Sequence, residues 1–134
     1  MLKTILSIPG KSGLYKLVSS GKNLLVVETV DEVKKRMPVH GTDKVISLAD
    51  IAMYTDETEV PLGEVFNNIK ELKNGELVDL NYKKATPAEL QGFMAEVLPN
   101  YDRDRVYNND IKKLISWYNI LVSNGLTDFI EKSE

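Results

Sequence analysis

Short apolar runs separated by turn-forming residues fill the first part of the chain. The runs at residues 14–18 and 24–30 are rich in β-favouring residues, and a Ser/Gly/Asn segment at residues 19–23 lies between them, as in a hairpin. Further short runs follow at residues 34–39, 45–46 and 51–55. Short strands with frequent turns predict a small antiparallel β-barrel or curled sheet, SH3-like or Sm-like, because closure hides edge strands.

The spacing of apolar residues becomes helical in the second part of the chain. Residues 61–73 carry apolar side chains three and four positions apart, which predicts a helix with Pro61 in its first turn. Residues 76–82 fit either a strand or an extended link, and the pattern does not separate the two.

Two more helices are predicted towards the C-terminus. Thr86 and Glu89 have the spacing of a capping box, with Pro87 at the first helical position, and one apolar face then runs to Leu98. A last helix opens near residue 108 and ends at Asn124-Gly125, where the backbone readily turns left-handed.

These two patterns together predict an α+β chain of two units. The acidic segment 56–59 separates them, so we expect a small β-barrel-like domain at residues 1–55 and a helical domain at residues 56–134. A chain of 134 residues is short for two independent cores. We therefore expect the helical unit to pack against the barrel, or the chain to form a homodimer.

Composition and charge narrow the classes of function. Hydrophobic residues make up 43% and charged residues 28% of the chain, as in ordinary globular proteins. The formal charge of −3 and a sequence pI of about 5.3 make nucleic acid a possible but not a favoured partner, because phosphate-binding proteins usually carry a basic face. Since the chain has no cysteine, disulfides and Cys-ligated metals are excluded.

The location in the cell is inferred from the lengths of the apolar runs. No run approaches the roughly 20 residues that a membrane helix needs. The apolar N-terminus is too short for a signal peptide and has no cleavage-type sequence. We therefore expect a cytoplasmic protein without a membrane partner.

Residues that could support catalysis are few. His40 is the only histidine, and with Asp43 it lies in a Gly-containing turn, so an ordinary turn histidine is favoured over a catalytic one. The Gly-Lys-Ser triplet at residues 10–12 lacks the preceding glycine of a phosphate-binding loop. Asp102 and Asp104 alternate with arginines, which indicates local ion pairing rather than calcium binding. We expect no catalytic residue, no metal site and no cofactor.

One basic cluster, Lys34, Lys35 and Arg36, is the candidate nucleic-acid-binding site. Small barrels often bind oligonucleotides on a strand face and stack the bases on aromatic side chains. Only Tyr15 and Tyr54 are available for stacking within the predicted strands. A solvated edge strand that resists aggregation explains the same cluster and is the favoured interpretation.

Aromatic and charged residues gather in a second place, towards the C-terminus. Trp, Tyr and Arg are the residues that most often anchor protein interfaces. Trp117, the only tryptophan, lies off the main apolar stripe of its predicted helix, and an interdomain packing role is slightly favoured for it over an interface role. The candidate partner-binding residues are Tyr101, Arg103, Arg105, Tyr107 and Trp117.

Three segments carry a resemblance to a known family. They are IPGKSGLYKLV at residues 8–18, PLGEVF at residues 61–66, and LPNYDRDRVY at residues 98–107, which leads into KKLISWY at residues 112–118. The chain resembles a family of small bacterial proteins, found mainly in Bacteroidetes-type bacteria, that join two domains of unknown function. The resemblance implies a barrel-like first part and a helical second part, and it implies no activity, catalytic residue or cofactor.

The absence of a catalytic constellation and the aromatic–arginine cluster favour a non-enzymatic binding or adaptor module, with a protein as the partner. The first alternative is binding of RNA or single-stranded nucleic acid through the barrel. A small hydrolytic enzyme that uses His40 is less favoured than either.

Overall fold

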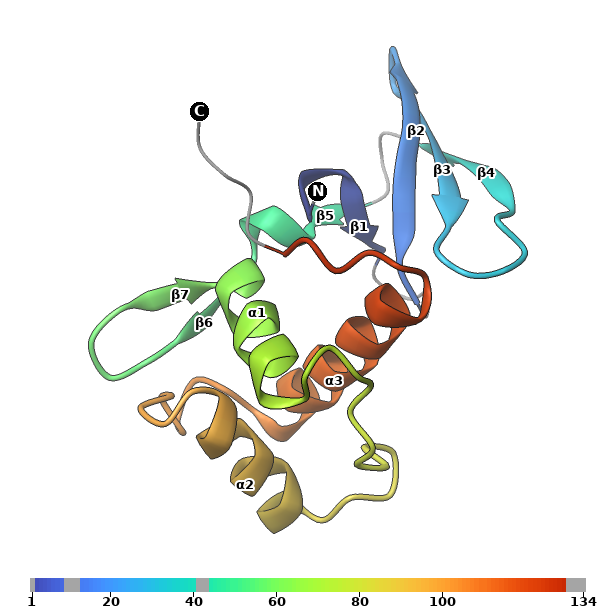
Figure 1. The fold of residues 1–134 in the computed structure, drawn as a ribbon. Coiled ribbons are helices and arrows are strands. Elements are labelled where there is room, and N and C mark those ends of the chain that lie inside the picture. Colours follow the sequence, from blue (N-terminus) through green and yellow to red (C-terminus); the bar gives the residue numbers. More distant parts are fainter. Residues whose placement is uncertain (1, 9–12, 41–43, 130–134) are drawn as a thin grey trace.

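A computed structural model describes residues 2–8, 13–40 and 44–129 (Figure 1). Its main sheet is antiparallel and has five strands in the order β4-β3-β2-β1-β5. The strands are β1 Ile5–Ser7, β2 Tyr15–Gly21, β3 Leu24–Thr29, β4 Arg36–His40 and β5 Ile46–Ser47. The α+β class is therefore confirmed, but β4 and β5 lie at opposite edges of an open sheet. Closure into an SH3-like or Sm-like barrel is not confirmed.

Two strands differ from the sequence prediction. β1 was not predicted, because only three residues extend after the short 3₁₀ turn Leu2–Thr4. The run at residues 51–55 was predicted as a strand of the main sheet, and this was wrong. Its strand β6 (Ala52–Tyr54) pairs with β7 (Glu59–Pro61) in a separate two-stranded sheet, because a short local hairpin satisfies the backbone without a long-range partner.

Three α-helices follow the hairpin, as the apolar spacing predicts: α1 Leu62–Leu72, α2 Pro87–Val97 and α3 Asn108–Ser123. The capping box of α2 is present, since the Thr86 hydroxyl accepts from the Glu89 N–H at 3.2 Å and the Glu89 carboxylate accepts from the Thr86 N–H at 3.1 Å. No helix in the described part of the chain is long and apolar enough to cross a membrane.

The link between α1 and α2 contains no strand at residues 76–82. Its extended backbone pairs instead with a side chain of α3. The Val78 N–H donates to Asn119 Oδ1 at 2.8 Å, and Asn119 Nδ2 donates to the Val78 carbonyl at 3.1 Å. An amide side chain thus completes hydrogen bonds that a neighbouring strand would otherwise make.

Alternating side chains of the main sheet enter two different cores. Ile5 and Leu14 join the larger core, which the three helices supply with most of its residues, including Phe66 and Tyr118. Adjacent positions face the other way into a smaller core of the sheet, formed by Leu6, Ile8, Tyr15, Val27 and Val39. This follows from the two-residue period of a strand. The larger core therefore contains residues from both parts of the chain.

The segment after α3 crosses the helices and returns towards α1 (Figure 1). The Phe129 ring is 97% buried and lies 5.3 Å from the Phe66 ring and 5.8 Å from the Tyr118 ring. Gly63 permits this approach, because a Cβ atom there would lie 2.5 Å from the Phe129 carbonyl oxygen. The aromatic cluster thus fixes the segment that leads to Phe129 over α1.

Candidate functional site

The aromatic–arginine segment, residues 101–107, is held against the β6–β7 hairpin. The Asp102 N–H donates to the Tyr54 carbonyl at 2.8 Å, and the Asp56 N–H donates to the Asn100 carbonyl at 3.0 Å. A β-bridge joins Thr55 to Tyr101 between these two hydrogen bonds. The segment therefore lies alongside β6, although a long stretch of sequence separates the two.

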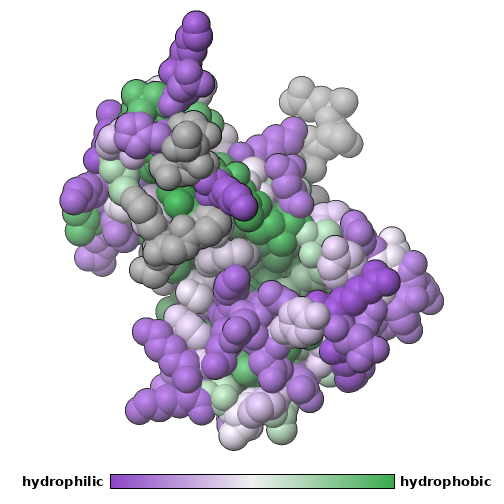
Figure 2. Space-filling model, turned by 180° about the vertical axis from the view of Figure 1, so that it is seen from behind, coloured by the Kyte–Doolittle hydropathy of each residue, from purple (hydrophilic) through white to green (hydrophobic). Residues whose placement is uncertain are grey.

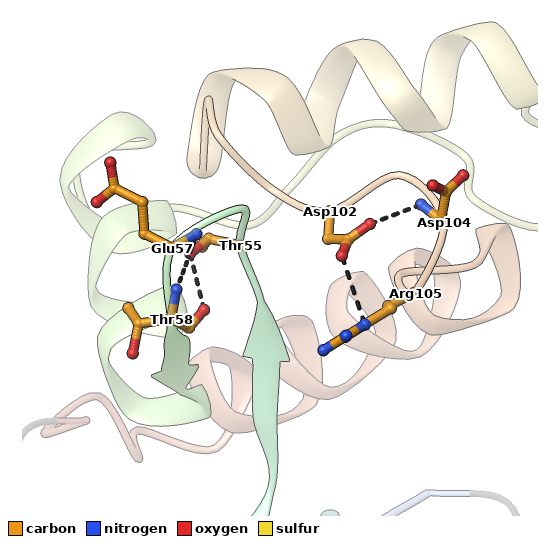
Figure 3. Close-up of polar contacts among 6 residues, drawn as sticks. All are labelled: Thr55, Glu57, Thr58, Asp102, Asp104 and Arg105. Carbon is orange, nitrogen blue, oxygen red and sulfur yellow. Dashed lines mark hydrogen bonds and ion pairs between the residues drawn. The ribbon is translucent and has the colours of Figure 1, made fainter.

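The tip of the hairpin is fixed by Thr55, a buried polar residue (Figure 3). Its hydroxyl donates to the Thr58 carbonyl at 2.7 Å and accepts from the Glu57 and Thr58 N–H groups at 3.2 and 2.9 Å. Because one hydroxyl closes the turn, the hairpin presents a rigid edge to the aromatic–arginine segment.

Asp102 organises the charged part of this segment (Figure 3). One carboxylate oxygen accepts from the Asp104 N–H at 2.9 Å, and the other lies 3.5 Å from Arg105 Nε. The Arg105 guanidinium also lies 5.3 Å from the centre of the Tyr54 ring, within the range of a cation–π contact. The predicted ion pairing is confirmed for Asp102 and Arg105, and it holds Arg105 from two sides.

A cavity of about 330 Å³ opens beside Arg105, between the sheet and the helices. Ser7 and Ile46 line it from the main sheet, Met53 from the hairpin, and Leu114 and Trp117 from α3. Two of the lining residues are partly exposed: Ile46, at 43%, and Tyr54, at 36%. Seen from behind, the molecule shows an apolar band between hydrophilic surfaces (Figure 2).

The charged lining of this cavity is mainly cationic. Arg105 and Lys113 contribute positive charges, and Asp110 contributes the one carboxylate. That carboxylate already accepts a hydrogen bond from the Tyr107 N–H at 3.0 Å, which caps the start of α3. Lys113 is exposed and has no ion-pair partner among the residues that the structure describes. The cavity can therefore accept an anionic group beside an apolar one.

A second cavity, of about 420 Å³, is lined by the hairpin tip and is acidic. Asp56, Glu57, Glu59 and Asp102 line it together with Arg105. Within the described residues, no group of three or more His, Cys, Asp or Glu side chains could hold a metal ion. Arg105 thus stands between an acidic surface and an apolar cavity.

The five predicted partner-binding residues have different environments. Arg105 and Trp117 line the same cavity. Tyr101 is buried, with no hydrogen-bond partner for its hydroxyl among the described residues, and its ring supports Arg103 at 4.6 Å. Tyr107 is 66% exposed. The sequence analysis missed Ile46 and Lys113, because nothing local in the sequence indicates that β5 and α3 meet.

The predicted basic cluster lies far along the main sheet, on the edge strand and the turn before it. Lys34, Lys35 and Arg36 are all exposed, and Arg36 Nε lies 3.9 Å from a Glu28 carboxylate oxygen. Lys34 has a positive φ of 53°, and its N–H donates to Asp31 at 2.9 Å. None of the three lines either of the two cavities.

The histidine of the less favoured enzyme hypothesis is also on this edge. His40 ends β4 and is exposed, and it lines neither of the two cavities. Asp43, its predicted neighbour in the turn, lies outside the described residues.

Comparison with known proteins shows which family the chain belongs to. A family model described as a domain of unknown function (DUF6852) matches residues 51–121. The chain belongs to this family. A second domain of unknown function (DUF5606) matches residues 2–48, so the resemblance to proteins with two such adjoining domains is confirmed. The cavity is lined from both regions: Ser7 and Ile46 come from the DUF5606 region and the other lining residues from DUF6852.

A solved structure has the same fold. It is a solution NMR structure of a structural genomics target from Bacteroides vulgatus, with 69% sequence identity and a TM-score of 0.81. The match covers 96% of this chain and 91% of the other. A comparison with curated proteins found no match.

Proposed function

We propose that this DUF5606–DUF6852 chain is a non-enzymatic binding or adaptor module, and that its cavity holds an apolar side chain of a partner protein. The observation that carries the proposal is the cavity itself, because side chains from both matched regions line it around Trp117. Its volume of about 330 Å³ lies at the lower end of the roughly 300–1,000 Å³ range of ligand sites.

The composition of the site supports a protein as the partner. Trp and Arg are enriched among the residues that dominate the energy of protein interfaces, and Trp117 and Arg105 both line this cavity. Ile46 and Tyr54 extend the apolar surface outwards from it. A partner chain could therefore place one side chain inside and cover the rim with its backbone.

Three expectations from the sequence belong to this proposal. The module does not need a closed SH3-like barrel, since the open sheet already supplies Ser7 and Ile46. A chain without cysteine forms no disulfides and needs no oxidising compartment, and we place the module in the cytoplasm. A homodimer is one form of the proposal, with a second copy of the chain as the partner.

Selection from a random peptide library on the purified, immobilised protein tests the proposal. We expect enriched peptides that bind the wild type saturably and lose binding to Ile46→Asp, which places a charge in the apolar lining. Val18→Asp is the matched control, because Val18 is also on a strand and is 38% exposed, against 43% for Ile46, but does not line the cavity.

The control variant should bind the enriched peptides as the wild type does. If no peptide is enriched above background, the cavity is not a protein-binding site and the proposal fails. Equal binding to both aspartate variants would refute it as well, because the peptides would then bind elsewhere.

A further inference from the structure

We propose that the partner segment carries an aspartate or glutamate next to its apolar anchor, and that this carboxylate binds between Arg105 and Lys113. The inference rests on the proposed function and adds the chemistry of the partner. It depends on three features of the cavity: an apolar interior, a cationic rim formed by Arg105 and Lys113, and an acidic surface beside it.

The interior selects an apolar side chain. Met53, Leu62, Val106 and Leu114 are buried, and they line the cavity together with the partly buried Trp117. A polar group placed among them would lose its hydrogen bonds to water without replacement, whereas an apolar group gains by leaving water. One aliphatic or aromatic side chain therefore fits this space best.

Arg105 is prepared to bind a carboxylate. Its Nε faces Asp102 at 3.5 Å, and Tyr54 supports the guanidinium plane at 5.3 Å. A guanidinium has five N–H donors, so the contact with Asp102 leaves several of them free for a second acceptor. These two contacts restrain the side chain while it stays 66% exposed, so it is accessible to a ligand and loses less conformational freedom on binding than an unsupported arginine would.

Lys113 supplies the second positive charge. It is exposed one turn after Asp110 on α3, and among the described residues no carboxylate pairs with it. The Asp110 carboxylate accepts from the Tyr107 N–H at 3.0 Å, which holds it at the start of the helix. Within the described lining two cations therefore face one carboxylate, while Asp102, which pairs with Arg105, lines the second cavity.

The neighbouring acidic surface argues for an isolated carboxylate rather than a polyanion. Asp56, Glu57 and Glu59 line the second cavity, which shares Arg105 with the first. A nucleic-acid strand that passed the cavity would bring a row of phosphates near these carboxylates, and like charges repel. A single Asp or Glu beside an apolar residue meets the cations without this penalty.

The fluorescence of Trp117 can report binding at this site directly, because it is the only tryptophan of the chain and lines the cavity. The probes are two blocked pentapeptides of nearly the same shape, acetyl-Ser-Asp-Leu-Asp-Ser-amide and acetyl-Ser-Asn-Leu-Asn-Ser-amide. We expect both to change the emission saturably, with the Asp peptide binding about tenfold more tightly, as two exposed ion pairs allow.

The ratio of the two affinities in charge variants locates the effect. Lys113→Glu should bring the ratio to about one or below it, since one rim cation becomes an anion. Lys112→Glu is the matched control, because it makes the same charge change at the adjacent position of α3, outside the cavity lining. It should leave most of the preference for the Asp peptide. A general loss of folding would weaken both peptides alike and would not change the ratio.

A ratio near one in the wild type would overturn the inference, and so would an equal loss of preference in both lysine variants. Absence of a saturable response to the Asp peptide would overturn it too. Equal binding of the two peptides would still leave the proposed function standing, whereas an empty library selection removes the proposed function itself.

Discussion

Replacing Gly63 with alanine tests how the segment around Phe129 is fixed over α1. The new Cβ atom would lie 2.5 Å from the Phe129 carbonyl oxygen and 3.3 Å from Leu2 Cδ1. The first distance is far below van der Waals contact and involves backbone, so the C-terminal segment has to move. The Phe129 ring would then shift away from its place against Phe66 and Tyr118.

The size of the effect follows from two opposing contributions. Complete loss of a buried Phe side chain costs about 3–5 kcal/mol. Alanine in place of a helical glycine raises the free energy of unfolding by at most about 1 kcal/mol, because of its higher helix propensity. Because the segment can shift without leaving entirely, we expect the free energy of unfolding to fall by about 2 kcal/mol. With an m-value of about 2 kcal/mol/M, the urea midpoint falls by about 1 M.

Urea unfolding followed by circular dichroism measures this change, and Gly92→Ala is the matched control. Gly92 is exposed within α2, and a Cβ added there would meet no atom within 4 Å from the described chain beyond its neighbours and the nearby backbone of its own helix. That variant should be stabilised by about 0.5–1 kcal/mol, since only the helix propensity changes. In a chain that lacks residues 127–134, Gly63→Ala should no longer destabilise. A Gly63→Ala midpoint at or above that of the full-length wild type would refute this reasoning.

Three further predictions concern single hydrogen-bonding groups. Thr86→Ala removes the N-cap of α2 and should lower the free energy of unfolding by about 1 kcal/mol in urea. Burial raises the pKa of Tyr118 above its ordinary value of 10.0. The unfolded chain therefore loses this proton at a lower pH than the folded chain does. As a result, the free energy of unfolding of the wild type falls as the pH rises above 10 through the folded pKa. The stability difference between the wild type and Tyr118→Phe should shrink over that range in urea unfolding. The pKa of Asp31 is lowered by the Lys34 N–H and then by the Thr29 hydroxyl. The contribution of the Asp31 carboxylate to stability is present above pH 3.8 and is lost as the pH falls through the lowered pKa. The urea midpoints of the wild type and Asp31→Asn should therefore converge in acid.

The helices could be predicted from the sequence because their determinants are local. The capping box at Thr86 and Glu89 and the apolar face that follows fix both the start and the direction of α2. The strands were less predictable. Three residues are too few for β1 to show an alternating pattern, and the partner of β6 is decided by the hairpin that Thr55 closes.

The cavity could be predicted only in part. Arg105 and Trp117 were found because their residue types are typical of interfaces. Ile46 and Lys113 are ordinary residues of a strand and a helix, and only tertiary packing brings them to the same cavity. Tyr101 shows the opposite case: its type suggests an interface, but its ring is 97% buried between the hairpin and the helices.

The central claim is that the cavity, and not the basic edge strand, is the binding surface. Amide chemical-shift mapping of the ¹⁵N-labelled protein during titration with acetyl-Ser-Asp-Leu-Asp-Ser-amide tests it most directly. We predict that the largest shifts occur at cavity residues, Ile46, Val106 and Lys113 among them, together with the Trp117 indole N–H. Shifts concentrated at Lys34, Lys35 and Arg36 with an unchanged cavity would contradict the account.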